Sequence, residues 1–144
     1  MFATKFDAVG AYSNVGVETA ITEASPHRLV VLLFEGAKEA IILAKAGIEA
    51  GDIQKKGVSI SKAIDIILNG LRASLNMEEG GDLSQNLYAL YDYMARRLLY
   101  ANVNNDIAAL DEVFSLLSEI HSAWVEIGEN LVPSASTTSN QPAR

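Results

Sequence analysis

The sequence predicts an all-α fold, an antiparallel up-down four-helix bundle with a short N-terminal helical cap and a disordered C-terminal tail. Apolar residues recur at three-and-four spacing through four long segments, which is the pattern of amphipathic helices. Short connections at Gly51, Gly80-Gly81 and Asn104-Asn105 separate these segments. Short connections make consecutive helices antiparallel neighbours.

The composition fits one globular domain, since 49% of the 144 residues are hydrophobic and 20% are charged. We expect an N-terminal segment with the cap helix at residues 1–24, the bundle at 25–131 and the tail at 132–144. The tail residues are small and polar with two prolines, so they bury too little apolar area to offset their ordering entropy.

The first helix should begin at Ser25-Pro26, because serine caps free amides and proline has no amide to leave unsatisfied. Gly51 is a natural stop, since glycine adopts the left-handed conformation without steric cost. The second helix should run from about Lys56 to Asn76. Its apolar stripe consists of Ile60, Ile64, Ile67, Leu71 and Leu75.

The third helix should begin at Asp82, which has capping-box spacing to Gln85. Its stripe consists of Leu83, Leu87, Leu90, Tyr91, Met94, Leu98 and Ala101. A short turn at 102–106 precedes a fourth helix that runs from Ile107 to Leu131.

Several functional classes are excluded by composition and pattern. A net charge of −7 argues against a nucleic-acid partner, which would require a basic surface. The chain has no cysteine, its start does not read as a secretory signal, and no apolar run could span a membrane, so we expect a cytoplasmic protein without membrane insertion. His27 and His121 form no recognisable nucleophilic or metal-ligand arrangement, so we expect neither an enzyme nor a metal site.

An apolar surplus remains beside the predicted stripes. One interpretation is a wide core face; the other is a groove that accepts an amphipathic partner, or a homodimer interface. The surplus consists of Val31, Ile42, Ile66, Leu68, Tyr88, Tyr93, Leu99 and Tyr100.

Many short fragments over residues 10 to 128 share one register. The fragments are Tyr12, Ala24-Ser25-Pro26-His27, 32–37, Gly51-Asp52, 61–67, Gly80-Gly81, Asn86-Leu87, 90–94, 96–98, Ala101-Asn102, Asn105-Asp106 and Ala123-Trp124. Their order and spacing resemble the FliS family of flagellar secretion chaperones.

The resemblance implies a cytoplasmic export chaperone that needs no cofactor. It would bind the disordered C-terminal segment of flagellin, prevent premature polymerisation and keep flagellin competent for type III export; the export gate and assembly regulators are further candidate partners. The alternative is a self-associating helical adaptor bundle without chaperone activity.

We expect the flagellin groove on the second and third helices. The apolar candidates are Ile60, Ile64, Leu68, Leu71, Leu87, Tyr88, Tyr91, Met94 and Leu98, and the polar candidates are Asn86, Asn102 and Asp106. For Asn102 and Asp106, helix capping is the alternative role. In the N-terminal segment, Tyr12, Val17 and Ile21 are candidates for a cap that covers the groove and moves aside for flagellin; a permanent cap on the core is the alternative.

Overall fold

The structure is a computed structural model that describes the backbone of residues 25–137 and the side chains of residues 25–128. It contains four long helices and, within these residues, no strand, which confirms the predicted helical bundle. The elements are α3 (Pro26–Ala50), α4 (Ile53–Ile66), a π-helical turn η1 (Ile67–Leu71), a 3-10 turn η2 (Arg72–Ser74), α5 (Gly81–Asn104) and α6 (Ile107–Thr137).

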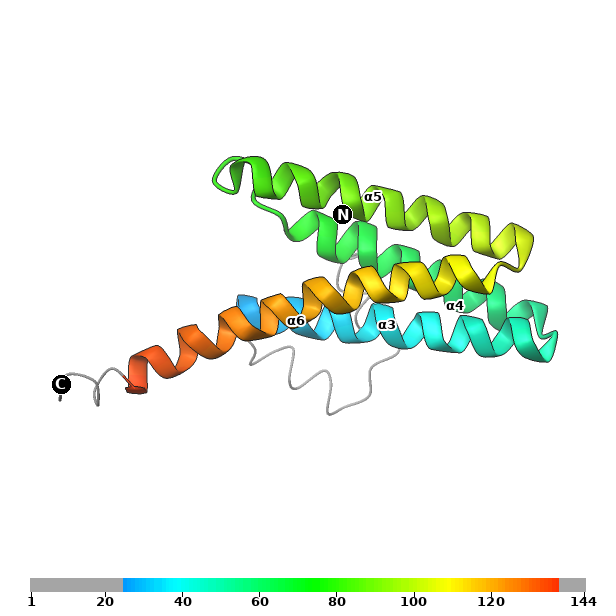
Figure 1. Ribbon diagram of the computed structural model, residues 1–144, viewed down its shortest axis with the longest axis horizontal. Coiled ribbons are helices and arrows are strands. Elements are labelled where there is room, and N and C mark those ends of the chain that lie inside the picture. Colours follow the sequence, from blue (N-terminus) through cyan, green and yellow to red (C-terminus); the bar gives the residue numbers. More distant parts are fainter. Residues whose placement is uncertain (1–24, 138–144) are drawn as a thin grey trace.

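Consecutive helices run antiparallel, and the α3–α4 and α5–α6 connections lie at the same end of the bundle (Figure 1). α3 packs against α4 and α6, while α5 packs against α6, α4 and η1. The C-terminal part of α6 extends beyond the other helices. α4 and α5 are therefore neighbours with a shared outer surface.

The predicted signals at both ends of α3 are confirmed. Arg28 N–H donates to Ser25 Oγ at 3.1 Å, and Pro26 occupies the first turn. Gly51 has a φ of 72°, in the left-handed region that favours glycine. Asp52 then caps α4 by accepting from Lys55 N–H at 3.0 Å, so the second helix begins at Ile53 rather than near Lys56.

The second helix does not continue regularly to Asn76 as predicted. Its hydrogen bonds widen at η1, where Arg72 N–H donates to Ile67 C=O five residues earlier, and then tighten into η2. Gly70 lies in this turn, and a Cβ there would be 3.1 Å from Leu33 Cδ2 of α3. The π turn thus coincides with a close approach between the two helices.

The predicted capping box at Asp82 is wrong. α5 begins at Gly81, and its N-cap residue Gly80 offers no side-chain hydrogen bond. The turn is instead organised by Asn76, whose Oδ1 accepts from the N–H groups of Glu78 and Glu79 at 3.2 and 2.9 Å. Asn76 supplies the local hydrogen bonds that compete with a longer second helix.

α6 begins at a side-chain cap and ends later than predicted. Asp106 Oδ1 accepts from Ala109 N–H at 3.1 Å, and Asn105 before it has a φ of 52°. The helix continues to Thr137, whereas the sequence places its end at Leu131. Residues 138–144 of the predicted tail lie outside the described residues.

The core occupies the space between all four helices. Val31 and Ile66, two members of the apolar surplus, are buried, which agrees with the wide core face for these two residues, because a helix that touches two neighbours buries more than one row of side chains. The largest fully buried side chains are Phe34, Ile60, Ile66, Ile67, Leu71, Met94, Leu98, Leu110, Val113 and Leu117.

Candidate partner-binding face

Five of the predicted groove residues belong to the core, with exposed fractions of 3% or less: Ile60, Leu71, Tyr91, Met94 and Leu98. Burial raises the pKa of the Tyr91 hydroxyl above its usual range, which fits this position. Helical periodicity identifies the apolar side of a helix, but it does not separate side chains that fill the core from those that line an outer groove.

The other four apolar candidates retain accessible surface. Ile64, Leu68 and Leu87 are partly buried and pack against the edge of the core. Tyr88 is 42% exposed. These four side chains can meet a partner without any opening of the bundle.

The polar candidates also divide into an accessible residue and residues that make contacts within the bundle. Asn86 is exposed on α5. Asp106 caps α6, and the carbonyl of Asn102 accepts from Lys56 Nζ at 2.9 Å. Lys56 Nζ also donates to Asn105 Oδ1 at 2.7 Å, so the polar groups at this end of α5 join it to α4.

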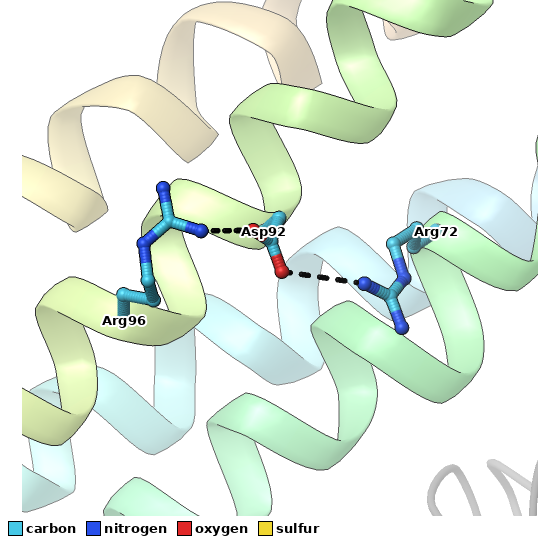
Figure 2. A network of polar contacts seen from close by, with 3 residues as sticks. All are labelled: Arg72, Asp92 and Arg96. Carbon is cyan, nitrogen blue, oxygen red and sulfur yellow. Dashed lines mark hydrogen bonds and ion pairs between the residues drawn. The ribbon is translucent and has the colours of Figure 1, made fainter.

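Arg72 of η2 links the end of the second helix to α5. Its guanidinium carbon lies 4.7 Å from the centre of the Tyr88 ring, and Nη1 lies 3.5 Å from Asp92 Oδ1. Arg96 binds the other carboxylate oxygen of Asp92, so this carboxylate lies between two guanidinium groups (Figure 2).

Two rows of side chains extend from this link. On the second helix Ile64 and Leu68 precede Arg72 at intervals of four, and on α5 Tyr88, Asp92 and Arg96 have the same spacing, with Leu99 three residues further. Residues three and four apart share a helix surface. We call these seven residues the α4–α5 face: Ile64, Leu68, Arg72, Tyr88, Asp92, Arg96 and Leu99.

Four members of this face were absent from the predicted site, namely Arg72, Asp92, Arg96 and Leu99. Leu99, which is 54% exposed, appears in the sequence only as part of the apolar surplus. The opposite charges of Asp92 and Arg96 at a spacing of four were the signal available in the sequence. Arg72 has no comparable signal, because its partners lie on another helix.

The opposite edge of α5 is occupied by contacts to α6. Tyr93 Oη and Arg97 Nε donate to the Glu112 carboxylate, Arg97 at 2.8 Å. These two hydrogen bonds, first that of Tyr93 and then that of Arg97, lower the pKa of Glu112. Arg97 is thereby committed to the α5–α6 contact, unlike Arg96.

The two histidines serve the contact between α3 and α6. His27 stacks on Trp124 and His121 stacks on Phe34. Among the side chains of residues 25–128 there is no group of histidine, aspartate and glutamate that could hold a metal ion. Over residues 25–137, each helix is too short or too polar to cross a membrane. Tyr12, Val17 and Ile21 lie outside the described residues.

The structure is thus an all-helical bundle whose outer surface combines accessible aliphatic and aromatic side chains with a network of ion pairs. Comparison with known proteins gives the family. The family model described as "Flagellar protein FliS" matches residues 8–131. The chain belongs to the FliS family.

Curated relatives agree with this assignment. The chain is 51% identical over 119 residues to the flagellar secretion chaperone FliS of Salmonella typhimurium, covering 83% of this chain and 88% of the relative. It is 48% identical over 126 residues to that of Escherichia coli, covering 88% and 91%. The FliS of Bacillus subtilis is 36% identical over 107 residues, covering 74% and 78%.

Proposed function

We propose that this chain is a cytoplasmic flagellar export chaperone that binds the C-terminal segment of flagellin, prevents its premature polymerisation and keeps it competent for type III export. The names of the relatives, flagellar secretion chaperones, support the export role. The observation that supports binding of a polypeptide segment is the α4–α5 face, which has accessible apolar side chains on two neighbouring helices that Arg72 links through Tyr88 and Asp92.

The expected mode of binding is coupled folding and binding. A disordered segment that becomes ordered on the bundle loses conformational entropy, and this loss must be offset by burial of apolar surface. Such complexes typically bury about 1,000–3,000 Å² and show a negative heat-capacity change. Leu68, Tyr88 and Leu99 contribute accessible apolar surface to such a contact. While the segment is bound, it is withheld from pairing with other flagellin subunits.

Titration calorimetry with a peptide of the flagellin C-terminal segment tests the proposal. One-to-one binding with a negative heat-capacity change is expected, together with no heat from a scrambled peptide of the same composition. A folded, helical sample that does not bind the native peptide would overturn the proposal. If that sample also formed dimers at low concentration, the self-associating bundle would be the better description.

A further inference from the structure

We propose that Arg72 and Arg96 form a recognition site for a carboxylate side chain, an aspartate or a glutamate, on the polypeptide that binds the α4–α5 face. This inference rests on the proposed function, because it names the chemistry of the segment that the face receives.

The first observation is the charge of the cluster. Two guanidinium groups share the single Asp92 carboxylate, so this place carries one more positive than negative charge in a chain whose net charge is −7. Asp65, which lies seven residues before Arg72, accepts a hydrogen bond from Asn69. Glu112 accepts from Arg97 and Tyr93 on the far edge of α5. Among the described residues, Asp92 is the only carboxylate that forms an ion pair with Arg72 or Arg96.

The second observation is the hydrogen-bonding capacity that remains. A guanidinium has five N–H donors in a planar fork that matches a carboxylate. Arg72 uses Nη1 on Asp92 at 3.5 Å, the long end of the hydrogen-bond range, while its plane is held near the Tyr88 ring. The side chain of Arg96 is 63% exposed, and its pair with Asp92 is of the i, i+4 type. Such exposed pairs contribute little to stability, so sharing Arg96 with a second carboxylate costs little.

The third step concerns the surroundings of the cluster. Leu68 and Leu99 belong to the same two rows as the arginines, so a segment that covers these side chains also removes water from the guanidinium groups. An unbalanced positive charge is costly once it is desolvated. A carboxylate on the segment removes that cost and fixes the register of the apolar side chains on either side of it. Purely apolar segments would be disfavoured at this position.

The test is a double-mutant cycle between the chaperone and the flagellin C-terminal peptide. Arg96→Gln and Arg72→Gln, each removing one charge, are titrated with the native peptide and with peptides in which each aspartate or glutamate is replaced singly by asparagine or glutamine. Lys45→Gln is the matched control, because Lys45 also forms an exposed pair, with Asp111 at 3.2 Å, on α3 and α6. Thermal unfolding verifies that each variant is folded.

We expect Arg96→Gln to weaken binding of the native peptide by about tenfold or more, whereas Lys45→Gln has no effect. Replacing one acidic residue of the peptide should weaken binding to the unaltered chain by a similar factor but have little further effect on Arg96→Gln. The binding of the unaltered chain should also weaken as salt is raised, and that of Arg96→Gln should depend less on salt.

Equal affinities for the unaltered chain, both arginine variants and the lysine control would overturn this inference while leaving the proposed function intact. A peptide with an amidated C-terminus is titrated in the same way. If Arg96→Gln were coupled to this amidation and to none of the side-chain replacements, the assignment to a side chain would be overturned. Absence of binding by the unaltered chain would overturn the proposed function and this inference together.

Discussion

His27 and Trp124 exchange hydrogen bonds in both directions. The His27 Nε2–H donates to the Trp124 carbonyl at 2.6 Å, and the Trp124 Nε1–H donates to the His27 carbonyl at 3.3 Å. Their rings stack with centres 5.1 Å apart and planes 6° apart. Because the residues lie 97 positions apart in the chain, this contact fastens the start of α3 to the later part of α6.

Gly128 should be required for this contact. A Cβ at position 128 would overlap the His27 ring, so Gly128→Ala should displace the imidazole and lower the free energy of unfolding by about 2 kcal/mol. In a His27→Ala background the ring is gone, and the same change should raise stability, since alanine is the better helix former by about 1 kcal/mol. Chemical unfolding of the four proteins measures both effects. Destabilisation of equal size in both backgrounds would contradict the account.

Gly47 should be irreplaceable for a different reason. A Cβ at this position of α3 would lie 2.8 Å from the backbone nitrogen of Lys56 in α4. A backbone atom cannot rotate away, so Gly47→Ala should cost about 1–3 kcal/mol of unfolding free energy. Gly57→Ala is the matched control, because a Cβ there meets no atom within 4 Å and should be neutral or stabilising. Equal stabilities of the two variants in urea unfolding would refute the close approach.

His121 should make the protein sensitive to mild acid. Lys38 Nζ lies 3.3 Å from His121 Nδ1, and since an ammonium only donates, Nδ1 must accept. The proton of the neutral ring then sits on Nε2, which is buried and has no hydrogen-bond partner among the described residues. Burial, and then the Lys38 charge, lowers the pKa of His121 below its ordinary value of 6.5, with Glu35 opposing and Arg28 assisting the shift.

A lowered pKa means that the unfolded chain takes up this proton more readily than the folded one. The free energy of unfolding should therefore fall as the pH drops below about 6.5, and the loss should be complete once the pH is below the pKa of the folded state. Urea unfolding across this range should show a shallower dependence on pH in His121→Leu. An identical pH dependence in the variant would assign the acid sensitivity to other groups.

Tyr88 should contribute to partner binding more than to stability. The residue is 42% exposed, and its ring is covered on one side by the Arg72 guanidinium. Tyr88→Ala should weaken flagellin-peptide binding by about tenfold, as expected for an aromatic side chain at an interface, while thermal unfolding changes little. Leu43→Ala on α3 is the control, since Leu43 is 41% exposed and lies away from the face. If both variants bound the peptide normally, Tyr88 would not belong to the binding surface.

The sequence predicted the helices and several of their ends because these depend on local chemistry. Ser25, Gly51 and Asp106 act through neighbouring backbone groups, and each has the capping or turn role that its residue type indicates. The sequence did not predict the turn at Asn76 or the start of α5 at Gly81, which has no side-chain cap. The Asn76 turn and the Asp82 capping box are competing local signals, and only the packing around them decides which one forms.

The binding face was less predictable than the fold. Met94 and Leu98 follow the same periodicity as accessible neighbours, and only the placement of the other helices shows that they are buried. Arg72 reaches Tyr88 and Asp92 from another helix, after a π turn that helical spacing does not reveal. The proposed role of Tyr12, Val17 and Ile21 over the groove stays a prediction, because these residues lie outside the described part of the chain.

Site-specific photocrosslinking tests most directly whether the α4–α5 face receives the flagellin segment. Leu99 on α5 and Ile42 on α3 are matched sites, with exposed fractions of 54% and 55%, and a benzophenone amino acid can replace either one. On irradiation with flagellin, position 99 should form a crosslink that maps to the flagellin C-terminal segment, and position 42 should form none. Crosslinking at position 42 alone, or equally at both positions, would contradict the assignment of this face.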